Sequence, residues 1–205
     1  MGSSEGTGVP VTISTEPVTL TETKIHLGLA TTTAAAAAYT NQDALLNRLI
    51  TTARIQAEQE TGRAFMTQTK TRYLDKWPYE NYIRIPYPPL QSAIVTYKLE
   101  SDTTYANTLS TIDTDIVSEP GRLVLQPNES WPSGTLYTDR PIKIVYVCGY
   151  GLAADVPEGI KSAILLKISD LYENRGEVVL GVSVSKIADA VDSLLRQYRI
   201  WTEFD

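Results

Sequence analysis

The sequence predicts an α+β fold: a helical core of three to four helices with an inserted antiparallel β region, a flexible N-terminal arm and a C-terminal tail. Apolar residues recur at the helical period of about 3.6 residues over residues 41–62 and again over 156–174. Between these segments, residues 65–148 are rich in Thr, Tyr, Val and Ile and are punctuated by Pro, Gly, Asn and Asp. The 205 residues are 42% hydrophobic and 20% charged, which is the composition of a globular protein.

The N-terminal part is expected to be irregular around one short helix. Residues 1–17 are rich in Ser, Gly, Thr and Glu, as is typical of a flexible arm. Residues 20–27 predict a short helix, with Thr21 as its N-cap and Gly28 at its end. In residues 31–38 (TTTAAAAA) alanine favours helix and threonine opposes it, so we interpret this segment as a linker with partial helicity.

Residues 41–62 predict the first long helix. Leu45, Leu49 and Ala53 share an apolar face, which Leu46, Ile50 and Ala57 widen. The polar positions include Arg48 and Arg54. Asn41 is the expected N-cap, and Gly62 is expected to end the helix.

The β region is expected to contain strands at 66–74, 82–85, 93–99, 112–117, 122–126 and 141–148. The segment 67–71 (TQTKT) is polar on both faces, which suits an edge strand or an exposed hairpin. A solvated β-arm and an arm that pairs with a neighbouring subunit both fit this pattern, because a lone hairpin is marginally stable without a partner surface. The candidate inter-subunit residues are Thr67, Thr69, Lys70 and Thr71.

The chain is expected to return to helix after the β region. Asp155, with Glu158 in the capping-box position, predicts the start of a helix over residues 156–174. A last helix is predicted over 185–196, and residues 18–199 are interpreted as a single domain.

The tail, residues 197–205, has no helical stripe but carries large side chains: Tyr198, Ile200, Trp201 and Phe204. Chain ends are usually polar and mobile, so these side chains either pack into the protein's own core or are kept for a partner. Tyr, Trp and Arg dominate binding hot spots, which favours docking to a partner.

The residue inventory excludes several kinds of site. Cys148 is the only cysteine and His26 the only histidine, which excludes an intrachain disulfide and a zinc site of several His and Cys ligands. The net charge of −6 disfavours tight non-specific DNA binding, which needs clustered Lys and Arg. The segment 149–154 matches a dinucleotide motif weakly, but no βα series follows it. We therefore predict a protein that is not an enzyme, with no catalytic residue, no metal and no cofactor.

Short motifs along the chain carry a family resemblance. They are LTETKIHL (20–27), DALLNRLITTARIQAEQETGR (43–63), IPYPPLQS (85–92), SEPGRL (118–123), YVCGYG (146–151), VPEGIKSAI (156–164), LYENR (171–175) and LLRQYR (194–199). In this order and spacing they resemble the head–tail connector (adaptor, or head-completion) family of tailed bacteriophages. The arm 1–17, the segment 31–40 and the tail after Arg199 depart from the family's pattern.

The resemblance implies a structural virion protein that forms a ring, typically of about twelve subunits, beneath the portal at the capsid vertex. It implies three partners: the portal protein, neighbouring copies of the chain, and the next neck or tail-completion protein. DNA would pass through the lumen without sequence-specific binding. In related connectors the C-terminal segment docks into the portal, and the residues in that position here are Tyr198, Arg199, Ile200, Trp201 and Phe204.

The resemblance also implies a place in the virion neck, after assembly in the host cytoplasm and without a membrane partner. Two other interpretations remain open from the residues alone. The first is a monomeric phage binding module or another tail or baseplate component. The second is an enzyme, which would have to use His26 or Cys148, although the sequence names no base beside Cys148.

Overall fold

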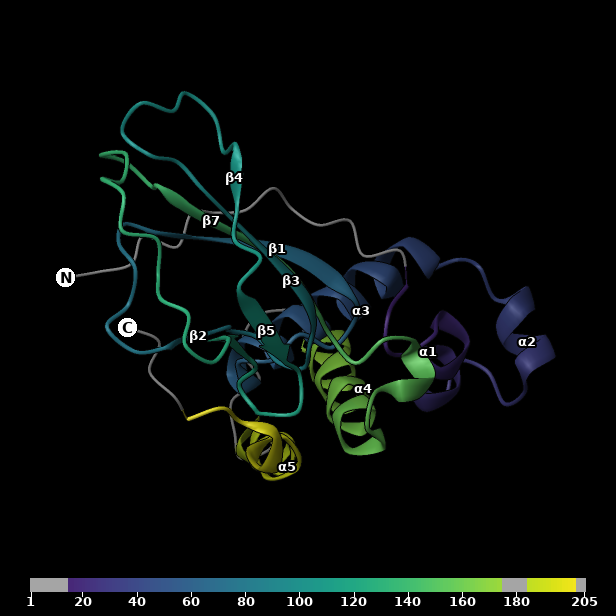
Figure 1. Cartoon of the computed structure of the whole chain (residues 1–205). Coiled ribbons are helices and arrows are strands. Elements are labelled where there is room, and N and C mark those ends of the chain that lie inside the picture. Colours follow the sequence, from purple (N-terminus) through teal and green to yellow (C-terminus); the bar gives the residue numbers. More distant parts are fainter. Residues whose placement is uncertain (1–14, 175–183, 202–205) are drawn as a thin grey trace. The chain divides into compact units, whose positions relative to one another are not determined.

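The computed structural model describes residues 15–174 and 184–201 (Figure 1). The chain forms two compact units: a helical unit, Ser14–Met66 with Tyr150–Arg199, and a β unit built on Thr67–Gly149. Helices and antiparallel sheets are both present. The predicted α+β class is therefore confirmed.

The helical unit begins with two short helices, α1 (Leu20–His26) and α2 (Thr33–Ala38). α1 starts with a capping box, in which the Thr19 hydroxyl accepts the N–H of Glu22 and the Glu22 carboxylate accepts the N–H of Thr19. The prediction of Thr21 as N-cap is therefore wrong, because only Thr19 has Glu22 at the capping-box spacing. The Thr/Ala segment 31–38, interpreted as a linker with partial helicity, is helical over Thr33–Ala38.

The long helix α3 (Asp43–Thr61) is confirmed with a later start. The residue before it is Gln42, which makes no side-chain cap, so the prediction of Asn41 as N-cap is wrong. Its buried apolar side chains all belong to the predicted apolar face: Leu46, Ile50, Ala53 and Ala57. Leu45 and Leu49 of the same face are partly buried. Gly62 ends the helix as predicted, with φ 67°, a left-handed conformation that glycine adopts readily.

The C-terminal helices are η1 (Ala153–Asp155), α4 (Glu158–Glu173), α5 (Val184–Leu195) and η2 (Arg196–Tyr198). α4 packs against both α3 and α5 (Figure 1). Its stripe of Ile160, Ile164 and Ile168 is fully buried, and each such side chain stabilises the fold by about 1.5–3 kcal/mol. Asp155 does not cap α4, contrary to prediction: its carboxylate accepts the N–H of Leu152 at 2.8 Å, within the preceding turn.

The β unit contains a four-stranded antiparallel sheet with the order β1-β7-β3-β4. Its strands are β1 (Gln68–Leu74), β7 (Ile142–Cys148), β3 (Leu90–Tyr97) and β4 (Asn107–Thr108). Burial alternates along β7, where Ile142, Ile144, Tyr146 and Cys148 face the core. β1 lies at one end of the strand order, as its polar sequence predicts.

A second, three-stranded sheet has the order β2-β6-β5 and consists of β2 (Tyr82–Arg84), β6 (Arg122–Leu125) and β5 (Ile112–Asp115). The turn into β6 passes close to β3, because a Cβ added at Gly121 would lie 2.5 Å from the Cβ of Leu90. All six predicted strands are present with shifted ends, and β4 is an additional strand. No helix among the described residues is long and apolar enough to cross a membrane.

Candidate interaction surfaces

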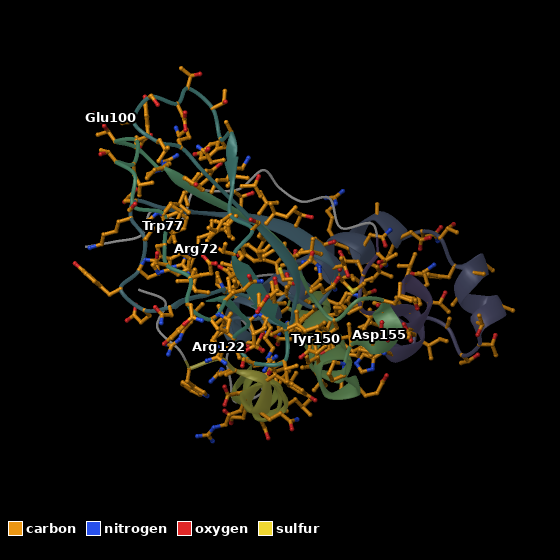
Figure 2. All side chains as sticks on the ribbon, in the orientation of Figure 1. Arg72, Trp77, Glu100, Arg122, Tyr150 and Asp155 are labelled. Atoms are coloured by element: carbon orange, nitrogen blue, oxygen red, sulfur yellow. The ribbon has the colours of Figure 1, made fainter. Side chains whose placement is uncertain are left out.

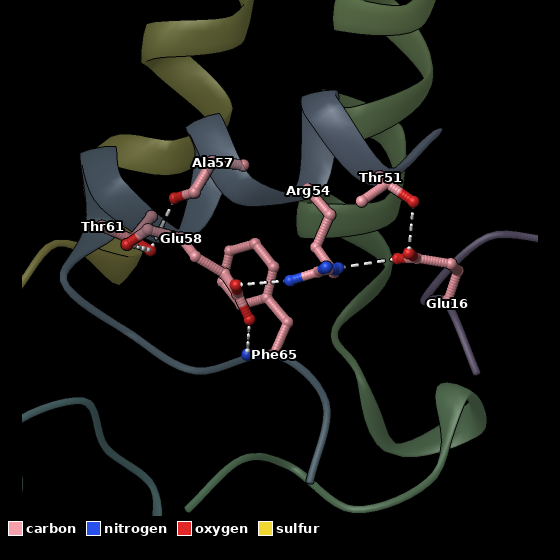
Figure 3. Close-up of polar contacts among 7 residues, drawn as sticks. All are labelled: Glu16, Thr51, Arg54, Ala57, Glu58, Thr61 and Phe65. Carbon is pink, nitrogen blue, oxygen red and sulfur yellow. Dashed lines mark hydrogen bonds and ion pairs between the residues drawn. The ribbon is translucent and has the colours of Figure 1, made fainter. Parts of the chain in front are cut away.

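A buried arginine organises the polar side of α3 (Figure 3). The Arg54 side chain donates to Glu16 Oε2 through Nε and to Glu58 Oε2 through Nη1, both at 2.7 Å. Glu16 also accepts from the Thr51 hydroxyl at 2.8 Å, and Glu58 accepts the N–H of Phe65 at 2.8 Å. The Arg54 guanidinium thus fixes two segments to α3. The segment before α1 is held through Glu16, and the segment after α3 is held through Glu58.

A buried lysine joins the three N-terminal helices in the same way. Lys24 Nζ lies 2.6 Å from Asp43 Oδ1 at the start of α3, and it donates to the carbonyl of Ala36 in α2 at 2.9 Å. Because a lysine is rarely buried without partners, these contacts fix α1 and α2 on α3.

The C-terminal segment leaves α5 in a fixed conformation. Arg63, which follows α3, donates through Nε to the carbonyl of Tyr198 at 2.6 Å. The ring of Tyr198 lies over Gly159 at the start of α4, where an added Cβ would be 3.0 Å from the tyrosine oxygen. Arg199 pairs with Asp192 of α5 at 2.6 Å. The chain is therefore held in the helical unit as far as Arg199.

The predicted portal-docking residues therefore fall into two groups. Tyr198 and Arg199 make the contacts just described within the helical unit. Ile200 is partly buried, whereas Trp201 exposes 77% of its surface. Phe204 lies outside the described residues. A large indole exposed directly after a fixed segment is the strongest docking candidate among these side chains.

The predicted inter-subunit residues lie on and just before β1. Thr67 accepts a hydrogen bond from the Gln91 side chain at 3.1 Å. Lys70 Nζ lies 4.2 Å from the centroid of the Tyr87 ring. Thr69 and Thr71 point to the face of the sheet opposite to Lys70, because side chains alternate along a strand.

That other face of the four-stranded sheet is the side turned away from the core of the β unit. Thr69 pairs with Val147 and Thr71 with Val145 across β1 and β7. On the other side of β7, these two valines pair with β3 residues Ser92 and Ile94. Ile94 exposes 61% of its surface.

The turn between β5 and β6 is held by one carboxylate. Asp115 Oδ2 accepts from the Ser118 hydroxyl at 2.6 Å and from Arg122 Nη2 at 2.8 Å, while Oδ1 accepts the N–H groups of Val117 and Ser118, both at 3.1 Å. The hydrogen bonds from Ser118 and then Arg122 hold the pKa of Asp115 well below its usual range. The turn presents Ile116 and Val117 to solvent, with 53% and 88% of their surfaces exposed.

Aromatic side chains gather elsewhere in the β unit. The rings of Trp77 and Trp131 stack with centroids 5.1 Å apart, and Tyr97 meets Trp77 edge-on at 5.6 Å. Trp131 donates its indole N–H to the carbonyl of Glu80 at 2.9 Å. Figure 2 labels Trp77 and Arg122, which lie in different parts of the β unit. Sequence reasoning missed this cluster, because Trp77 and Trp131 come from separate loops, Tyr97 ends β3, and the three share no periodic pattern.

A second group of rings surrounds Lys98. Its Nζ lies 4.1 Å from the centroid of Tyr137 and 4.9 Å from that of Tyr105. Burial and then the neighbouring Tyr73 raise the pKa of Tyr105. These contacts stabilise the loops at one end of the sheet.

The residues that an enzyme would need lie as follows. His26 is exposed on α1, and Cys148 is fully buried in β7, with its thiol donating to the carbonyl of Gln68 at 3.6 Å. Within residues 15–174 and 184–201, no three His, Cys, Asp or Glu side chains are grouped so that they could hold a metal ion. After the glycine-rich segment 149–154, α4 begins only at Glu158, whereas the dinucleotide motif requires an immediate helix.

The fold has close counterparts among solved structures. A chain in the structure of the virion of the native gene transfer agent (GTA) particle matches with a TM-score of 0.72 and 16% identity, covering 95% of this chain and 97% of that one. A chain in the neck of the empty GTA particle, computed with C6 symmetry, matches with a TM-score of 0.72 and 19% identity over 99% and 97%. A chain in the neck of the native GTA particle, computed with C12 symmetry, gives 0.71 and 17% over 99% and 97%.

No protein-family model matches the sequence, and no curated protein does. At such low identities the likeness to the GTA structures establishes the fold. The chain has, over nearly its whole length, the fold of a chain found in necks of a phage-like particle. This agrees with the resemblance to head–tail connectors that the sequence motifs carry.

Proposed function

We propose that this chain is a structural, non-enzymatic protein of the neck of a tailed phage or phage-like particle. It forms a ring adaptor between the portal and the next neck or tail-completion protein, and it extends the DNA channel. The observation that carries the proposal is the match over 99% of the chain to neck structures computed with C6 and C12 symmetry. Cyclic symmetry of this kind supports a ring, of about twelve copies in the simplest case.

The C-terminal segment supplies the contact with the portal. The residues assigned to docking are Tyr198, Arg199, Ile200, Trp201 and Phe204. Because Arg63 and Asp192 hold Tyr198 and Arg199 on the subunit, these two residues set the direction in which the segment leaves. Trp201, exposed over 77% of its surface, is the anchor that the portal buries. Burial of a large aromatic ring offsets the entropy lost when a chain end becomes ordered.

Neighbouring copies meet along the ring through the β unit. Thr67, Thr69, Lys70 and Thr71 lie on or beside the end strand of the four-stranded sheet, a position open to contact with another chain. The net charge of −6 suits a channel wall, because like charge lets DNA pass without binding tightly. Assembly takes place in the host cytoplasm, and the finished ring belongs to the virion neck.

The test is to measure the mass of the purified chain by light scattering and to image it by negative stain, with and without the cognate portal protein. Rings are expected, either alone or capping the portal. A homogeneous monomer that ignores the portal would contradict the proposal and would favour a monomeric binding module of the tail or baseplate instead.

A further inference from the structure

Three of the motifs that carry the family resemblance meet at one point of the helical unit. Arg63 lies in the motif that ends in TGR, Gly159 in the motif that begins with VPEG, and Tyr198 in the motif that ends in QYR. Arg63 follows the end of α3, Gly159 is the second residue of α4, and Tyr198 is the last residue of η2. Residues far apart in the sequence therefore come together where the C-terminal segment leaves the helical unit.

Tyr198 is held from two sides. Its carbonyl accepts a hydrogen bond from Nε of Arg63 at 2.6 Å, and Arg63 exposes only 7% of its surface. Its ring lies against Gly159, where an added Cβ would be 3.0 Å from the phenol oxygen and 3.3 Å from Cε2. Atoms at such distances repel one another, because optimal contacts between carbon atoms lie at about 3.5–4.0 Å. We call Arg63, Gly159 and Tyr198 the tail clamp.

The glycine of the clamp is unfavourable for the helix that contains it. Gly159 has a helical conformation in α4 and no positive φ, so its backbone does not require a glycine. Alanine favours helix more strongly than glycine does. What glycine provides at this position is the space that the Tyr198 ring occupies.

The residues beyond the clamp have little freedom. Arg199 pairs with Asp192 of α5 at 2.6 Å, and its backbone N–H donates to the carbonyl of Arg196 at 3.3 Å. Trp201 follows Arg199 by two residues, so the Cα atoms of these two residues are at most about 7 Å apart. The clamp therefore limits the positions that the exposed side chain of Trp201 can reach.

We propose that the tail clamp holds the docking segment in the conformation that the portal binds, and that Arg63 and Gly159 are positioning residues for this contact. The inference rests on the docking of the tail to the portal proposed above. A segment that is held in its bound conformation before it meets a partner loses less conformational entropy on binding, which raises the affinity. Arg63 and Gly159 thus contribute to portal affinity through Tyr198, and no contact of their own with the portal is needed.

Gly159→Ala tests the clamp in a chain that still folds. The added methyl group displaces the Tyr198 ring, whereas alanine favours α4, so the midpoint of urea denaturation is expected to stay at the wild-type value or rise. The affinity for the cognate portal, measured by isothermal titration calorimetry, is expected to fall about tenfold. Hydrogen exchange over residues 196–201 without the portal, followed by mass spectrometry, is expected to speed up about tenfold.

Two comparisons separate the clamp from a general effect on α4. The matched control is Ser162→Ala, at an exposed position of the same helix, which is expected to change neither the affinity nor the exchange rate. Tyr198→Leu shows whether Gly159 acts through the ring. In that background the ring is absent, so Gly159→Ala is expected to accelerate exchange over residues 196–201 no further. This second comparison needs no portal.

The possible failures are distinguishable. Wild-type affinity of Gly159→Ala for the portal would overturn the clamp and leave the ring adaptor intact. So would a loss of affinity that is matched by a lower midpoint of urea denaturation, because binding would then follow the stability of the fold. Further acceleration of exchange in the Tyr198→Leu background would also overturn the clamp, because Gly159 would then act without the ring. A wild-type chain that does not bind the portal would overturn the proposed docking itself.

Discussion

Arg54 shows how a single residue can connect the parts of the helical unit. Arg54 is 6% exposed, and its guanidinium lies between the carboxylates of Glu16 and Glu58. Removing one partner of a buried ionic group leaves the others desolvated and unpaired, which typically costs about 3–5 kcal/mol. Arg54→Ala is therefore expected to lower the free energy of unfolding by about 3 kcal/mol, measured by urea denaturation.

Arg48 provides the control, because it lies on the same helix with its side chain exposed. Arg48→Ala is expected to change the free energy of unfolding by less than about 0.5 kcal/mol. Equal changes in the two variants would mean that the ion pairs of Arg54 contribute little to stability, because alanine has a higher helix propensity than arginine at both positions. The sequence identifies Arg54 only as a polar position, because its partner Glu16 lies 38 residues away in a segment predicted to be a flexible arm.

The turn between β5 and β6 is the element whose order depends most on one side chain. Asp115→Ala removes the acceptor for the N–H groups of Val117 and Ser118. Their amide hydrogen exchange is expected to speed up at least about tenfold, since these bonds hold a turn and not a sheet ladder. The measurement is exchange followed by NMR. The control is Asp113→Ala, because the Asp113 carboxylate accepts from the Gln126 side chain.

The same turn has a definite dependence on pH. The folded-state pKa of Asp115 lies below its usual value. Its contribution to the stability of the turn is therefore fully present above the unfolded-state pKa of about 3.9. That contribution is lost as the pH falls through the lower folded-state pKa. Unchanged exchange in Asp115→Ala would mean that packing, and not the Asp115 carboxylate, holds the turn.

Elements were predictable where a period or a punctuating residue marks them. The isoleucine stripe of α4, the alternation of β7 and the end of α3 at Gly62 all carry such signals. The starts of helices were less predictable, because several residues near each start can cap. β4 has two residues, too few for any pattern, and it exists because β3 offers it a pairing edge.

At the scale of the whole molecule, the order of helix, β region and helix was sufficient to predict the fold class. The interaction surfaces were predictable only as segments. The sequence marks the tail as aromatic and β1 as polar, but it cannot show that Arg63 holds the carbonyl of Tyr198 across 135 residues. Contacts of that range depend on packing and have no signature in local residue order.

The division of the tail at Arg199 leads to the last prediction. Deleting residues 200–205 is expected to leave the circular dichroism spectrum of the folded chain unchanged and to abolish co-sedimentation with the portal. Deleting 197–205 also removes the acceptor of buried Arg63 and the ring over Gly159, so it is expected to cost about 1–3 kcal/mol of stability in addition.

Trp201→Ala should weaken portal binding about thirtyfold, the effect of losing a hot-spot anchor. Normal portal binding by the shorter deletion would refute docking through the tail, whatever its effect on stability.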